Sequence, residues 1–185
     1  MNIVDTAIRS LKITGVERLD PVSVYIEGYV QGKGKLTVEC FGKSWSAFWG
    51  AIGKKTVEEF ILSSDICYLA NSLWDHSKEQ YEDDLTGVTQ YVRKTIIERR
   101  REEFVCRDTA RAIYDIEDWE YSMPQHPYDE FHKHDDLSEY QFIDAQSILE
   151  NYNIEQKQTS EYAYLNRIVS VVQDALKQLS EKESK

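Results

Sequence analysis

The amino-acid sequence predicts an α+β fold in which an N-terminal antiparallel sheet of about three strands packs on a C-terminal helical region. Up to about residue 55, apolar side chains alternate with polar ones, which is the period of a strand, and seven of the eight glycines lie there. Beyond residue 55, apolar side chains recur every three or four residues, which is the period of a helix. We expect a single domain over residues 1–185, with a β-rich part at 1–55 and a mainly helical part at 56–185.

The expected sheet begins with a hairpin. Apolar residues alternate over residues 22–26 and again over residues 36–40, and a turn at Gly32, Lys33 and Gly34 separates the two runs. Residues 44–50 keep the same period and place Trp45, Ala47 and Trp49 on one face. This third run is typical of another strand of the same sheet.

Capping residues and apolar periodicity predict the helices. Thr56 and Glu59 form a capping box before a short helix, and Ser64 and Thr86 stand where they could cap two more. From Tyr114 to Asp136 the periodicity is lost, which predicts a loop or lid. The expected helices cover residues 56–62, 64–73, a long segment from Thr86 through the basic residues up to Arg111, 137–151 and 161–181.

Charge and composition exclude several classes of protein. The chain carries 33 Asp and Glu against 22 Lys and Arg, a net charge of −11, which excludes a histone-like DNA coat. It has no apolar run of the roughly 20 residues that span a membrane. The first ten residues also lack the shorter apolar run of a secretory signal, so we expect the protein in the cytoplasm. Three widely spaced cysteines show no CxxC pair, and we interpret them as reduced thiols, most of them buried.

The acidic loop at 114–136 combines negative charge with aromatic side chains. Eight acidic residues occur there against a single lysine, Lys133. Aromatic anchors among like charges are typical of a surface that binds a basic protein groove, although a solvated loop has the same composition. The predicted partner-binding residues are Asp115, Glu117, Asp118, Trp119, Glu120, Tyr121, Tyr128, Asp129 and Glu130.

A basic run and an aromatic run support an alternative function in nucleic-acid binding. The basic run comprises Arg93-Lys94 and Arg99-Arg100-Arg101, continued by Arg107 and Arg111. An arginine ridge on a helix could hold phosphates, and aromatic side chains on a sheet could stack on bases. The same arginines could instead pair with Glu98, Glu102 and Glu103 on a solvated helix face, and the tryptophans could belong to the core. The residues of this alternative are Arg93, Arg99, Arg100, Arg101, Trp45 and Trp49.

A histidine cluster is a weak candidate for a metal site. His126, His132 and His134 occur among aspartates and glutamates, which is the composition of a zinc or manganese site, but they lack a known ligand spacing. A metal-dependent hydrolase is therefore a further alternative. We find no catalytic motif, nucleotide fingerprint or phosphate loop, and we expect no metal or other cofactor.

Several segments resemble a family of small accessory proteins encoded by tailed bacteriophages and prophages. The resemblance is carried by Cys40-Phe41-Gly42-Lys43-Ser44-Trp45-Ser46-Ala47-Phe48-Trp49-Gly50, the following Gly53 and Thr56, Asp118-Trp119, Pro124, and Tyr162-Ala163-Tyr164-Leu165-Asn166-Arg167-Ile168. It implies a setting in the cytoplasm of an infected bacterium and no particular activity. Taken with the charge, it leads us to expect a non-enzymatic protein that binds a basic host protein and inhibits a nucleic-acid-handling defence or recombination enzyme.

Overall fold

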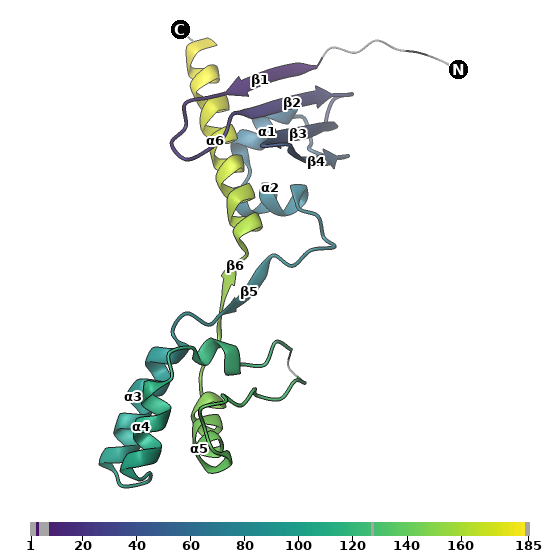
Figure 1. Ribbon diagram of the computed structural model, residues 1–185. Coiled ribbons are helices and arrows are strands. Elements are labelled where there is room, and N and C mark those ends of the chain that lie inside the picture. The colour runs from purple at the N-terminus through teal and green to yellow at the C-terminus, as the bar shows by residue number, and fades with distance from the viewer. Residues whose placement is uncertain (1–2, 4–7, 127, 184–185) are drawn as a thin grey trace. The chain divides into compact units, whose positions relative to one another are not determined.

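The computed structural model describes residues 3, 8–126 and 128–183, and these fall into two compact units. Unit 1 contains residues up to 81 and from 158 onward, and unit 2 contains residues 82–157. The α+β class is confirmed (Figure 1). That residues 1–185 form a single domain stays a prediction. An unfolding experiment can test it by asking whether the two units unfold together.

Unit 1 is built on a four-stranded antiparallel meander. Its strands are β1 (Arg9–Ile13), β2 (Val22–Gly28), β3 (Gly34–Cys40) and β4 (Lys43–Trp49), paired in chain order. The three predicted strands are confirmed. The sequence prediction missed β1, because this edge strand has no fully buried residue and alternates only between half-buried and exposed positions.

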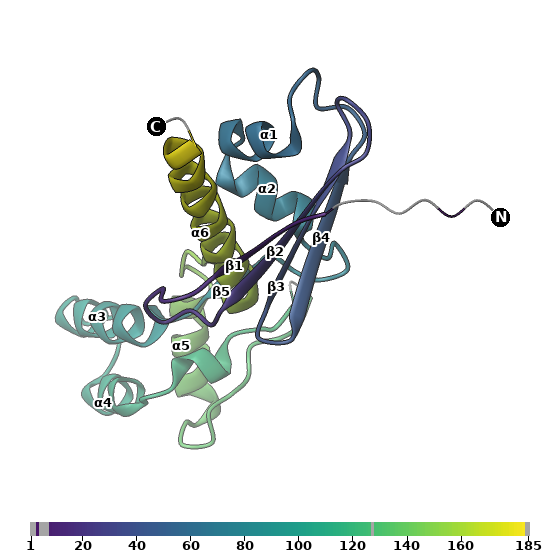
Figure 2. The same ribbon diagram turned by 90° about the horizontal axis from the view of Figure 1, so that it is seen from above.

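Three helices cover one face of this sheet. They are α1 (Val57–Ser63), α2 (Ile66–Leu73) and α6 (Ser160–Glu183), and Figure 2 shows all of them on the same side of the strands. The inward positions of the strands meet the apolar stripe of α6 in one core cluster. Trp45 and Trp49 belong to that core, with 7% and 8% of their surface exposed.

Two glycines set the local geometry of the sheet. The β2–β3 turn places Gly32 at φ +81°, and the amide of Ile52 donates to its carbonyl at 2.9 Å. Gly34 lies directly under α1, where a Cβ would overlap the side chain of Val57. The predicted turn is confirmed, and the second glycine lets a helix pack close to the strand.

Unit 2 is helical around its own core. It contains α3 (Val88–Arg101), α4 (Arg107–Asp115), the 3-10 turn η1 (Trp119–Ser122) and α5 (Glu139–Leu149). Val88, Val92 and Ile96 of α3 are fully buried in this core, as their spacing predicted. The chain passes from unit 1 to unit 2 through β5 (Tyr81–Asp84) and returns through β6 (Glu155–Gln158). These two strands pair in a short sheet.

Several predicted helix boundaries were wrong. Asp65 caps α2 in place of Ser64, because its carboxylate accepts from the amides of Cys67 and Tyr68. Gly87 is the residue before α3, and Thr86 instead donates its hydroxyl to Asp84. The expected long basic helix is two helices, because the chain turns at residues 102–106 and Glu103 adopts φ +64°.

Candidate functional site

The negative charge of the chain is concentrated in unit 2. Residues 82–157 carry 19 Asp and Glu against nine Lys and Arg, a net charge of −10, whereas the rest of the chain carries 14 against 13, a net charge of −1. Long-range electrostatic attraction to a basic partner would therefore originate almost entirely in unit 2. Unit 2 also holds both of the candidate sites described below.

The first candidate site is the acidic aromatic segment, residues 115–136. All of its acidic side chains are exposed, as are Tyr121 and Tyr128, which have 64% and 98% of their surface exposed. Trp119 is fully buried, so its predicted role as a surface anchor was wrong. Its place is the core of unit 2, where its indole Nε1 donates to the carbonyl of Ile113 at 3.3 Å.

Buried side chains and backbone contacts hold the acidic aromatic segment against unit 2. Ile116, Trp119 and Met123 lie in the core at intervals along the first part of the segment. Thr89 of α3 donates its hydroxyl to the carbonyl of Glu117 at 3.3 Å and accepts from the amide of Trp119 at 3.2 Å. Residues 116–123 of the segment are therefore held in place, which lowers the conformational entropy that binding there would cost.

Two of the three histidines of this segment, His132 and His134, pack on aromatic rings. The rings of His132 and His134 lie 5.8 Å and 6.4 Å from that of Tyr121, and the backbone amide of His126 donates to Asp129 at 3.1 Å. Across residues 3, 8–126 and 128–183, no three His, Cys, Asp or Glu side chains are grouped closely enough to hold a metal ion.

Two arginines of the basic run stabilise the fold of unit 2. Arg93 of α3 donates to the carbonyls of Tyr114 and Ile116 at 3.0 and 3.2 Å, which satisfies the C-terminal end of α4. Arg99 donates to the hydroxyl of Ser147 at 2.6 Å and to the carbonyl of Asp144 at 3.4 Å, both on α5. Both guanidinium groups thus contact backbone carbonyls rather than a free surface.

The second candidate site is the arginine groove, an open hollow of about 710 Å³ between α3 and α4. From α3 it is lined by Ile96, Ile97, Arg100 and Arg101. From α4 it is lined by Arg107, Asp108, Ala110, Arg111 and Tyr114. Of the arginines proposed from the sequence, Arg100 and Arg101 therefore line a groove. Arg107 and Arg111 belong to the basic run in the sequence, but only the fold places them opposite α3.

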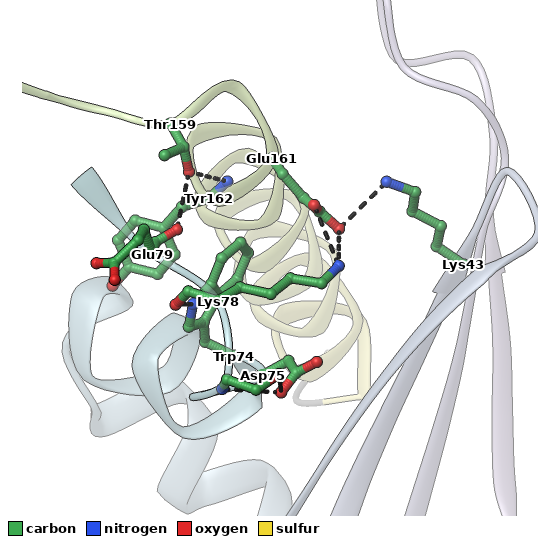
Figure 3. A network of polar contacts seen from close by, with 9 residues as sticks. Lys43, Trp74, Asp75, Lys78, Glu79, Thr159, Glu161 and Tyr162 are labelled. Atoms are coloured by element: carbon green, nitrogen blue, oxygen red, sulfur yellow. Dashed lines mark hydrogen bonds and ion pairs between the residues drawn. The ribbon is translucent and has the colours of Figure 1, made fainter. Parts of the chain in front are cut away.

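Unit 1 holds a polar network that joins three of its segments (Figure 3). The carboxylate of Glu161 accepts from Lys78 at 3.1 Å and from Lys43 at 3.2 Å. Hydrogen bonds from Lys78 and then Lys43 lower the pKa of this carboxyl. Beside it, the indole of Trp74 donates to the carbonyl of Lys78, and its ring meets Tyr162 edge to face at 5.1 Å. The network fixes the start of α6.

The cysteine thiols have different surroundings. Cys40 is buried and lies 3.2 Å from the hydroxyl of Tyr164, a contact that raises the pKa of the tyrosine to about 12. Cys67 and Cys106 are exposed, which differs from the expectation that most of the thiols are buried. Hydrogen bonding with Thr109 lowers the pKa of Cys106, whose sulfur caps α4.

Together, the fold and the sites define an α+β protein with a near-neutral sheet unit and an acidic helical unit. The chain matches the model of Phage_phiTE_072, described as a phage family, over residues 1–178, and it belongs to that family. Searches of the curated proteins and of the solved structures found no significant match. Among the described residues, no helix is long and apolar enough to cross a membrane.

Proposed function

We propose that this phage protein acts in the cytoplasm of the infected bacterium by binding a basic host protein through the acidic aromatic segment of unit 2. The observation that carries the proposal is the exposure of Tyr121 and Tyr128 among eight exposed carboxylates. Tyrosines supply the contact area typical of interface hot spots, and the surrounding charges select the sign of the partner. The role is non-enzymatic in this proposal.

The anchoring of the segment supports a binding role over that of a solvated loop. Core residues are interspersed among its acidic side chains, and its backbone accepts from Thr89 and Arg93 of α3. Exposed tyrosine rings contribute no hydrophobic stabilisation to the fold. A partner that covers Tyr121 and Tyr128 would bury both rings, and that burial would favour binding. The segment thus has the composition of a binding surface, and buried contacts hold its first part in place.

A basic cleft that handles nucleic acid is the partner class that best fits this surface. Such a cleft attracts phosphates, and the carboxylates of the segment present the same sign of charge. We therefore propose that the protein inhibits a defence or recombination enzyme of the host by occupying its nucleic-acid cleft. Association would be accelerated by the −10 charge of unit 2 and slowed by salt.

Affinity capture with matched variants tests the proposal. The tagged protein is incubated with nuclease-treated bacterial lysate at low and moderate salt, and retained proteins are identified by mass spectrometry. We expect retention of a basic nucleic-acid-handling enzyme, and we expect Tyr128→Ala and the pair Asp129→Asn with Glu130→Gln each to reduce it at least several-fold. The control pair Glu102→Gln with Glu103→Gln makes the same charge change in unit 2 outside the segment and should leave retention unchanged.

The purified partner then provides the decisive measurement. Its activity on DNA should fall as this protein is added, and excess DNA should reverse the inhibition, because both ligands compete for one cleft. The proposal fails if the control pair weakens capture as much as the segment variants do. It fails equally if retained proteins disappear with nuclease treatment, since nucleic acid then bridges the complex.

The sequence-based alternatives receive less support from the geometry. The base-stacking platform needs Trp45 and Trp49 on a surface, and both belong to the core of unit 1. Arg93 and Arg99 contact backbone carbonyls within unit 2. Only Arg100 and Arg101 of that proposed set line an open groove, and their position suggests a different ligand.

A further inference from the structure

We propose that the arginine groove of unit 2 binds a nucleotide, with its phosphates at the end near the α3–α4 turn and its base near Tyr114. The proposal concerns a different surface from the acidic aromatic segment and does not depend on it. The groove volume of about 710 Å³ falls within the roughly 300–1,000 Å³ typical of small-ligand sites.

The polarity of the groove changes along its length. Helices α3 and α4 are joined by residues 102–106, so the last residues of α3 lie beside the first residues of α4 (Figures 1 and 2). Arg100, Arg101 and Arg107 therefore gather at the end near the turn. Ile97, Ala110 and Tyr114 lie farther from the turn. A ligand that suits this groove has a compact anionic end and a flat apolar end.

The arginines at the turn end are available for a ligand. Arg100, Arg101 and Arg107 are exposed, and within the described part of the chain none of them has an ion pair or side-chain hydrogen bond. Arg111 pairs with Asp115 at 2.6 Å, but both groups are exposed and such a pair contributes little. Three free guanidinium groups can hold phosphate oxygens through paired N–H donors.

The apolar end of the groove suits a nucleobase. Tyr114 is 40% exposed, and the guanidinium carbon of Arg93 lies 5.4 Å from its ring centre. This contact restrains the ring beside Ile97, which is 39% exposed. Asp108, next to Arg107 in the first turn of α4, adds a carboxylate nearer the turn end of the lining, where it can accept from a ribose hydroxyl.

The charge of unit 2 favours a nucleotide over a longer nucleic acid. A strand would extend its phosphates beyond the groove toward the surrounding acidic surface, whose net charge is −10. A nucleotide keeps its few charges beside the arginines, and distant carboxylates are screened beyond a Debye length of about 8 Å at physiological salt. An acidic peptide distributes its carboxylates along its length, whereas the free arginines gather at one end.

Calorimetric titration of the full chain with ATP as the probe tests this proposal. We expect saturable binding, weaker binding of tripolyphosphate, and the weakest binding of adenosine, because each of the latter fills only one end of the groove. Arg101→Gln and Arg107→Gln should each lower the affinity for ATP about tenfold, as expected for loss of a charged hydrogen bond. Tyr114→Leu should lower the affinity for ATP and leave that for tripolyphosphate unchanged.

A matched control separates a built site from general electrostatics. Lys94→Gln removes one positive charge from an exposed position on the same helix, outside the groove, and should leave ATP affinity unchanged. Equal weakening by Lys94→Gln and Arg101→Gln would overturn the proposal, as would the absence of saturable ATP binding at millimolar concentration. Tighter binding of a single-stranded oligonucleotide or of an oligoglutamate peptide, lost in the same arginine variants, would overturn it in favour of that ligand.

Discussion

The two units of this protein use their side chains in different ways. In unit 1 the alternation of each strand separates apolar from polar positions, and the apolar face is buried under three helices. In unit 2 the segment at 115–136 supplies core residues and exposed carboxylates with no regular period. The comparison teaches that a regular alternation of apolar and polar residues indicates the scaffold. A binding surface can form instead where a segment has no regular period and buried side chains attach it to the core.

Charge shows the same division. Unit 1 is almost neutral and forms ion pairs that join its segments, such as those of Glu161. Unit 2 has an excess of ten acidic groups and also holds the arginine groove. Self-repulsion in unit 2 opposes folding, so its core must offset that cost, and the excess charge is then available for attraction to a partner.

The largest expected effect comes from removing the central side chain of unit 2. Trp119→Ala should lower the free energy of opening that hydrogen exchange measures in α3 and α5 by about 3–5 kcal/mol. The reason is that removal of a fully buried indole leaves a large cavity. Exchange measured by mass spectrometry reports both units in one experiment. If the chain is one cooperative domain, β2 and β3 lose the same protection. Unchanged protection in those strands would contradict the single-domain prediction.

A medium effect is expected from a methyl group placed beneath α1 in unit 1. Gly34→Ala should lower the free energy of unfolding by about 1–3 kcal/mol, because its Cβ would overlap Val57 and lie 2.5 Å from the carbonyl of Glu27. Gly28 pairs with Gly34 across the β2–β3 ladder and has open space around it. Urea unfolding of Gly28→Ala is therefore the control, and an equal loss in both variants would show that close packing is not the cause.

The smallest expected effect concerns the pH dependence of the Glu161 network. Because lysines lower the pKa of this carboxyl below its unfolded value, its stabilisation is present above the unfolded pKa near 4.5 and is lost as pH falls through the folded pKa. Glu161→Gln should reduce the free energy of unfolding by about 0.2–1 kcal/mol at pH 7. The difference from wild type should shrink below pH 4, with the exposed Glu181→Gln as control. A difference independent of pH would contradict the ionic origin.

Most of the scaffold could be predicted from the sequence. The strand period placed Trp45, Ala47 and Trp49 on one buried face, and the capping box of Thr56 with Glu59 forms as expected. The exceptions have local reasons. Strand β1 lacks fully buried positions, and the basic run reads as one continuous helix because nothing in its charge pattern announces the turn at Glu103.

The candidate sites could be predicted only in part. The acidic segment stands out by composition alone, but composition could not tell the exposed Tyr128 from the buried Trp119. The basic run stands out equally, yet Arg93 and Arg99 contact carbonyls while Arg100 and Arg101 face the groove. Which side of a helix meets its neighbour depends on residues distant in the sequence.

The sequence by itself determined the α+β class, the resemblance to a phage family and the acidic character of the second half, because these depend on local period, motif and residue count. Only the tertiary structure decided that the charge lies in one unit, that Trp119 is a core residue and that arginines of α3 and α4 line the same groove. The physical reason is that burial and convergence arise from packing between segments far apart in the chain.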